Sequence, residues 1–159
     1  MRSLMPLPDP APVLVVDDDD LVRSILLSRL ERLSIPVVTA ASAEEALAKI
    51  EVMRVSALVL DLHMPGQSGL VLAEFIRLFG AHLTGVPILI FTGTSLTPET
   101  LQLARRFSAD VFSKPNDLNA LLQRLAVLAD PMQQMLRMER MISGSGPTGS
   151  GSDHRDPES

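Results

Sequence analysis

The stretch best suited to chemistry is a run of four carboxylates, residues 17–20, which directly follows the apolar residues 13–16. A second apolar run, residues 57–60, ends in the same way at Asp61. Continuous Val and Leu runs are typical of strands buried on both faces of a parallel sheet. The carboxyl ends of such strands form the edge at which open α/β sheets bind ligands. We therefore predict that one crevice holds Asp17, Asp18 and Asp61.

Carboxylates gathered at one crevice repel one another. Two of them about 4 Å apart repel by roughly 1 kcal/mol in water and by roughly 4 kcal/mol at an effective dielectric constant of 20. Such a cluster therefore requires a bound cation, protonation of one carboxyl group, or both.

Two further polar residues follow apolar runs of the same kind. Residues 87–91 precede Thr92, and the short run 110–113 precedes Lys114 and a proline. In a parallel sheet both residues reach the edge that carries the carboxylates. By itself, however, a Lys-Pro pair indicates only the end of a strand.

Five apolar segments alternate with five amphipathic segments along the chain. We expect strands at residues 13–17, 35–40, 57–61, 87–91 and 110–113. We expect helices at residues 21–33, 42–53, 70–79, 97–107 and 117–129. In the first helix, one apolar stripe is expected to contain Leu21, Ile25, Leu26, Leu30 and Leu33. The alternation predicts an α/β fold, a doubly wound parallel sheet with helices on both faces.

The two ends of the chain differ from this central part. Residues 1–10 are rich in proline and predict a disordered lead-in, followed by one domain over residues 11–129. Residues 130–142 predict a short helical extension in which methionine recurs at every third position from Met132 to Met141. Residues 143–159 are rich in Gly, Ser and polar residues and predict a disordered tail.

Composition excludes several classes of function. The net charge of −5 leaves no basic patch for nucleic acid. The absence of cysteine excludes disulfides and thiol chemistry. No apolar run approaches the length that spans a membrane, so we expect no membrane contact and a cytoplasmic location.

Four short motifs, taken together, point to a family. They are Val-Val-Asp-Asp at 15–18, Leu-Asp-x-x-Met-Pro-Gly at 60–66, Ile-Phe-Thr-Gly at 90–93 and Ser-Lys-Pro at 113–115. In this order and spacing the chain resembles the receiver domain of two-component response regulators, the fold of the bacterial chemotaxis regulator. The resemblance covers residues 11–129 and implies a flavodoxin-like sheet of five parallel strands in the order 2-1-3-4-5. It also leads us to expect a single-domain response regulator.

The resemblance implies a role for each polar residue at the strand ends. Asp61 would be the phosphoacceptor and form an acyl phosphate. Asp17, Asp18 and Asp61 would hold Mg²⁺ together with the backbone carbonyl of His63, which suits a hard cation that prefers oxygen ligands. The site would be completed by two residues that contact the phosphoryl oxygens, Thr92 and Lys114.

The fifth strand departs from the family pattern. The family places an aromatic residue three positions before the lysine, where this chain has Val111. That aromatic residue normally follows Thr92 inward when the domain is phosphorylated. Either Phe112 takes over this role or the aromatic coupling is lost.

The resemblance also implies partners. The phosphoryl donor would be a sensor histidine kinase or a phosphotransfer protein, and the output would be contact with a downstream protein target. A homodimer through the fifth helix or the Met-rich extension is a separate hypothesis, which rests on the flexible methionine surface and not on the resemblance; packing of that surface along the fifth helix is the alternative. The chain would not be an enzyme beyond catalysing its own phosphotransfer and dephosphorylation.

Two alternatives remain open. The first is a receiver-like interaction module that is never phosphorylated. The second is a phosphatase of the aspartyl-phosphate type. Such phosphatases often carry a second Asp two residues after the nucleophile, where this chain has His63.

Overall fold

A computed structural model describes residues 9–64, 66, 68–79, 83, 85–93 and 95–143. The elements, in chain order, are β1 (Val13–Val16), α1 (Asp20–Arg32), β2 (Val37–Ala40), α2 (Ala43–Val52), β3 (Ala57–Leu60), α3 (Gly69–Phe79), β4 (Ile88–Thr92), α4 (Pro98–Arg106), β5 (Asp110–Ser113), α5 (Leu118–Ala129) and α6 (Pro131–Ser143). Every strand and helix expected over residues 13–129 is present, within two residues of its expected bounds. Disorder was expected for residues 1–10 and 143–159. Most of these residues, 1–8 and 144–159, lie outside the described part of the chain, and Ser143 is the last residue of α6.

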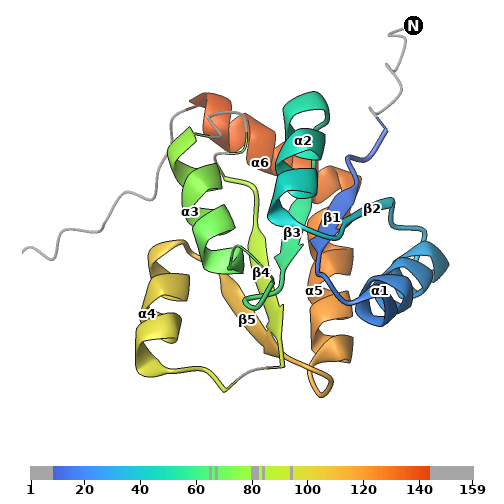
Figure 1. Cartoon of the computed structure of the whole chain (residues 1–159). Helices are drawn as coiled ribbons and strands as arrows, with labels where there is room; N and C mark the ends of the chain where they lie inside the picture. The colour runs from blue at the N-terminus through green and yellow to red at the C-terminus, as the bar shows by residue number, and fades with distance from the viewer. Residues whose placement is uncertain are drawn as a thin grey trace, which may run out of the picture.

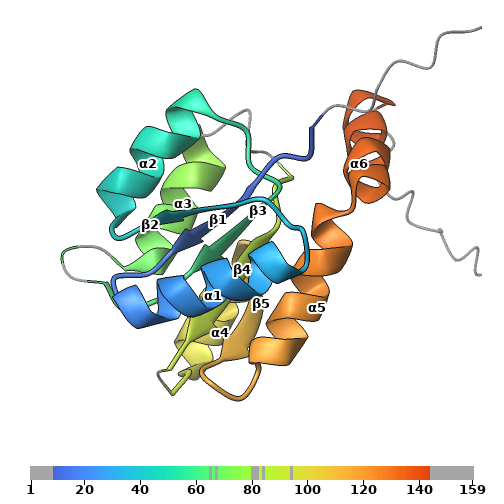
Figure 2. The same cartoon turned by 90° about the vertical axis from the view of Figure 1, so that its right-hand side faces the viewer.

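The five strands form one parallel sheet in the order β2-β1-β3-β4-β5. This confirms the expected doubly wound topology. Figures 1 and 2 show α1 and α5 on one face of the sheet and α2, α3 and α4 on the other. All strands therefore present their carboxyl ends at the same edge, where β1 and β3 lie side by side.

The central strands are buried because each of their two faces has its own core. Alternate residues such as Leu14 and Leu60 pack against α2 and α3. Their neighbours Val15 and Val59 pack against α1 and α5. Burying one such side chain stabilises the fold by roughly 1.5–3 kcal/mol relative to leaving it exposed. This two-sided burial explains why the strands are continuous apolar runs.

The predicted apolar stripe of α1 was wrong in part. Leu26 and Leu30 are buried against the sheet, whereas Leu21 and Ile25 remain 66% and 39% exposed. The reason is helical geometry, because Leu21 and Leu26 are five residues apart and so point roughly 140° away from each other. Leu33 is half exposed at the end of the helix.

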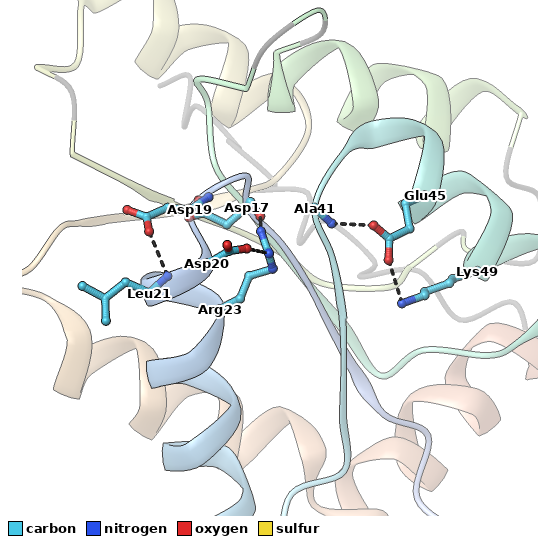
Figure 3. Close-up of polar contacts among 8 residues, drawn as sticks. All are labelled: Asp17, Asp19, Asp20, Leu21, Arg23, Ala41, Glu45 and Lys49. Carbon is cyan, nitrogen blue, oxygen red and sulfur yellow. Dashed lines mark hydrogen bonds and ion pairs between the residues drawn. The ribbon is translucent and has the colours of Figure 1, made fainter.

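The turn from β2 into α2 is fixed by a capping box between Ser42 and Glu45. The Ser42 hydroxyl accepts a hydrogen bond from the Glu45 amide at 3.1 Å, and the Glu45 carboxylate accepts one from the Ala41 amide at 2.8 Å. Lys49 forms an ion pair with Glu45 at 3.2 Å (Figure 3). The pKa of Glu45 is lowered mainly by the hydrogen bond from the Ala41 amide and next by the hydrogen bond from Lys49. This turn borders the edge of the sheet that carries Asp17.

The Met-rich segment is a separate helix, α6. The Asp130 carboxylate accepts a hydrogen bond from the Met132 amide at 2.8 Å, so Asp130 ends α5 and begins α6. Figure 2 shows α6 beyond the end of α5, away from the carboxyl edge of the sheet. Across the described residues, no helix is both long enough and apolar enough to cross a bilayer.

Candidate functional site

The parallel register brings the polar strand ends together. Asp17 follows β1 and Asp61 follows β3, and the Asp61 amide donates a hydrogen bond to the Val16 carbonyl at 3.0 Å. One carboxylate oxygen from each of three residues lies within 4.8 Å of the other two: Asp17, Asp18 and Asp61. The three carboxylates that the sequence predicts to meet therefore lie together in the fold. Asp17 and Asp61 are buried, and Asp18 is exposed at its mouth.

Lys114 reaches this cluster from the end of β5. Its Nζ lies 2.6 Å from Asp17 Oδ2 and 3.6 Å from Asp61 Oδ2. The same atom lies 5.6 Å from the centre of the Phe91 ring. One largely buried ammonium group thus serves two buried carboxylates, which leaves part of the negative charge uncompensated.

The electrostatics of Asp61 follow from this arrangement. Burial raises the pKa of Asp61, and the negative charge of Asp17 raises it further. Lys114 and the His63 amide, which donates to Asp61 Oδ1 at 3.3 Å, oppose the rise without cancelling it. The carboxyl group is therefore poised to take up a proton or to share a cation.

The next two acids in the run serve α1. Asp19 caps the helix, since its carboxylate accepts from the Leu21 amide at 2.9 Å, while its own amide donates to Asp17 Oδ1 at 2.9 Å. Asp20 is exposed and forms an ion pair with Arg23 (Figure 3). Asp19 therefore fixes the turn that presents Asp17 and Asp18, whereas Asp20 lies at the surface outside it.

The cluster fits a divalent cation. Three carboxylates from two adjacent strands offer hard oxygen ligands at a spacing that one ion can bridge, and they carry more negative charge than Lys114 neutralises. The structure places the His63 amide on Asp61. Coordination by the His63 carbonyl stays a prediction.

Thr92 ends β4, between the strands that deliver Asp61 and Lys114. Its side chain is buried, and its carbonyl accepts the Lys114 amide at 2.8 Å. The threonine is thus tied through the backbone to the residue that carries the ammonium group.

The pleat of β5 separates the two candidates for the switch position. Val111 packs with Leu62 and Ala104, on the side of α4. Phe112 packs on the opposite face of the sheet, in the core beneath α1 and α5. The two candidates therefore lie on opposite faces of the sheet, with Val111 on the side of α4 and Phe112 on the side of α1 and α5.

Sequence reasoning missed two residues that shape the site. A Cβ atom on Gly69 would lie 2.0 Å from the Asp61 carbonyl oxygen, so only glycine allows α3 to begin against the phosphoacceptor candidate. The available signal was a glycine opening an otherwise apolar helix. The second residue is Arg23, which donates to the Asp17 carbonyl at 2.6 Å. The sequence carries no signal for this contact beyond the three-residue spacing of Arg23 from Asp20.

The first prediction concerns Asp61 and pH. A raised folded-state pKa means that the folded chain holds the Asp61 proton more tightly than the unfolded chain does. Its carboxylate therefore destabilises the metal-free fold at neutral pH, and this penalty disappears as the pH falls below the unfolded value of about 3.9. We expect Asp61→Asn to raise the urea midpoint at pH 7 in a chelator, with the gain shrinking toward pH 4.

Circular dichroism suits this measurement because the chain lacks tryptophan. Asp18→Asn is the matched control. It removes a charge from the same cluster at an exposed position, so its effect should be smaller. An Asp61→Asn midpoint at or below wild type at pH 7 would contradict the stated electrostatics.

The second prediction concerns Gly69. Gly69→Ala forces a methyl group into the Asp61 backbone, and overpacking of this kind costs about 1–3 kcal/mol of unfolding free energy. Gly93→Ala is the control, because its Cβ would meet only Lys114 Cβ at 3.8 Å and Lys114 Cδ at 4.0 Å, which are ordinary contacts. In urea unfolding, Gly69→Ala should be less stable than Gly93→Ala. Equal stabilities of the two variants would refute the close approach of Gly69 to Asp61.

Comparison with known proteins agrees with the geometry. The sequence model of one protein family, the response regulator receiver domain, matches residues 13–126 of the chain. The transcriptional regulatory protein FixJ of Azorhizobium caulinodans is 33% identical over 116 residues, which are 73% of this chain and 54% of FixJ. The sensor kinase/phosphatase CqsS of Vibrio cholerae is 31% identical over 115 residues, which are 72% of this chain and 17% of CqsS. The chain thus spans about half or less of these relatives.

Solved structures give the same result. The chemotaxis protein CheY4 of Vibrio cholerae superposes with a TM-score of 0.65 at 31% identity, over 72% of this chain and 98% of that one. A response regulator receiver protein from Pseudomonas putida gives 0.66 at 30% identity, over 72% and 93%. With the carboxylate cluster, the lysine and the strand order in place, the chain belongs to the response regulator receiver domain family of two-component systems.

Proposed function

We propose that Asp61 accepts a phosphoryl group from a phosphohistidine on a sensor histidine kinase or a phosphotransfer protein. The observation that carries this proposal is the position of Asp61, a buried carboxylate that shares one ammonium group with Asp17. An Asp61 carboxylate oxygen forms a bond to phosphorus while the bond between phosphorus and the histidine nitrogen breaks. The electron pair of that bond stays on the imidazole nitrogen, and the product is an acyl phosphate.

Mg²⁺ is the cofactor that we assign to this step. Asp17, Asp18 and Asp61 would hold it, with the His63 carbonyl as a further ligand. When bound, Mg²⁺ neutralises charge on the phosphoryl oxygens and orients them. As one of the ligands as well as the acceptor, the Asp61 carboxylate would be held in place for the transfer.

Lys114 and Thr92 complete the proposed chemistry. A phosphoryl group adds a charge of about −1.5 to −2. The Lys114 ammonium already lies 3.6 Å from Asp61, so it can turn from Asp17 toward the new phosphoryl oxygens. The Thr92 hydroxyl would donate to another of these oxygens. We propose that this rearrangement signals to a downstream protein target.

The two alternatives receive less support. A phosphatase that turns over outside substrates uses a second acid two residues past its nucleophile, and here the exposed His63 stands at that position. An interaction module without phosphorylation would have no need for three carboxylates and a partly buried lysine at one edge. We therefore propose that the chain catalyses only its own phosphotransfer and dephosphorylation, in the cytoplasm.

We propose that the phosphohistidine protein docks over the start of α1. Leu21 and Ile25 are apolar and exposed, and they lie just after the carboxylates at the mouth of the crevice. A cavity of about 90 Å³ lies beside them between α1 and α5, with Lys114 in its wall. An apolar contact here would bring a donor histidine next to Asp61. A homodimer through α5 or the Met-rich α6 stays a prediction.

The third prediction tests the phosphoacceptor. Acetyl phosphate with Mg²⁺ should add one phosphoryl group per chain, detected by intact mass, because acetyl phosphate needs no docking surface. Asp61→Asn should carry no label, since an amide oxygen is a poor nucleophile. Asp20→Asn is the control, because this exposed acid lies outside the crevice and should leave labelling intact. An unlabelled wild type, or label on Asp61→Asn, would refute the proposal.

The fourth prediction separates docking from chemistry. Leu21→Asp should slow transfer from a cognate phosphohistidine protein about tenfold or more, the scale of losing one apolar contact at a protein interface. Labelling by acetyl phosphate should remain unchanged. Val52→Asp, at an apolar residue that is 82% exposed on α2, is the control and should change neither rate. A loss in both assays would place Leu21 in the chemistry instead.

A further inference from the structure

We propose that Arg23 is a positioning residue for the metal site, and this inference rests on the proposed function. Arg23 belongs to the first turns of α1, and its side chain is only 17% exposed although it carries a charge. One guanidinium nitrogen, Nη1, donates to the Asp17 carbonyl at 2.6 Å, and Nη2 pairs with the Asp20 carboxylate (Figure 3). The guanidinium therefore bridges two residues of the acidic run.

The contact with Asp17 completes a four-point attachment. The Asp17 amide donates to the Ala40 carbonyl at 3.1 Å, and its carbonyl accepts from Arg23. Its two carboxylate oxygens accept from the Asp19 amide at 2.9 Å and from Lys114 at 2.6 Å. Every polar group of this residue is thus fixed, and Arg23 is the side chain that fixes the carbonyl.

That carbonyl sets the direction of Asp18. The Asp17 carbonyl and the Asp18 amide belong to one planar peptide unit. Holding the carbonyl therefore orients the backbone from which the exposed Asp18 side chain projects. Among the described residues, the Asp18 carboxylate has no hydrogen-bonded partner of its own. Its place beside Asp17 and Asp61 consequently depends on the backbone that Arg23 restrains.

Charge and geometry predict opposite signs for the removal of Arg23. If the guanidinium acted only through its positive charge, removing it would lower the repulsion of a divalent cation and would tighten Mg²⁺ binding. If it acts by holding the ligands in place, removing it should weaken binding. Partners that orient metal ligands typically contribute 10–100-fold in affinity. The sign of the change therefore separates the two roles.

The experiment is a Mg²⁺ titration of the full chain, followed through the amide NMR signals of residues 17–19. We expect Arg23→Gln to weaken Mg²⁺ binding about tenfold or more. Arg23→Lys should recover part of the loss, because an ammonium group can still donate to the Asp17 carbonyl. Thermal unfolding of each variant, measured in a chelator, reports any general loss of stability separately.

Two control variants keep the experiment specific. Arg29→Gln removes the same charge from the far end of α1, and Asp20→Asn breaks the exposed ion pair without touching the Asp17 carbonyl. Both should bind Mg²⁺ within about twofold of wild type. Arg23→Gln with unchanged or tighter binding would overturn the positioning role. Failure of the wild type itself to bind Mg²⁺ would instead refute the proposed function.

Discussion

One ammonium group among buried carboxylates organises the functional edge of this protein. Lys114 lies 2.6 Å from Asp17 and 3.6 Å from Asp61, and a single lysine cannot neutralise both acids and Asp18 as well. The raised pKa of Asp61 is the direct consequence of burial and this charge deficit. A folded domain accepts such a cost where function requires it.

The rest of the fold serves to hold these charges in register. Parallel pairing of β1 with β3 sets Asp17 beside Asp61, and the β4–β5 pairing carries Thr92 and Lys114 to the same edge. Backbone contacts then remove the remaining freedom. Gly69 allows α3 to start against the Asp61 peptide. The apolar cores on both faces of the sheet supply the stability that offsets the electrostatic strain.

The sequence could predict features that depend on the local pattern of residues along the chain, but not contacts between residues of different elements. The continuous apolar run before Asp61 predicts a buried parallel strand, because two-sided burial leaves a pattern along the chain itself. Contacts between residues of different elements leave no such pattern along the chain. The contact of Arg23 with the Asp17 carbonyl and the close approach of Gly69 to Asp61 depend on packing between elements, and the exposed Leu21 depends on how α1 is rotated. Motif order, however, correctly predicted which strand ends would meet.

A crystal structure of the protein grown with Mg²⁺ and beryllofluoride, a stable mimic of an aspartyl phosphate, would test the role of the shared lysine most directly. We expect beryllofluoride on the Asp61 carboxylate and Mg²⁺ among the three acids. We also expect Lys114 Nζ to move from Asp17 to a fluorine atom. A structure with beryllofluoride absent from Asp61, and with Lys114 still paired to Asp17 beside an empty cluster, would contradict this role of Lys114 and Asp61.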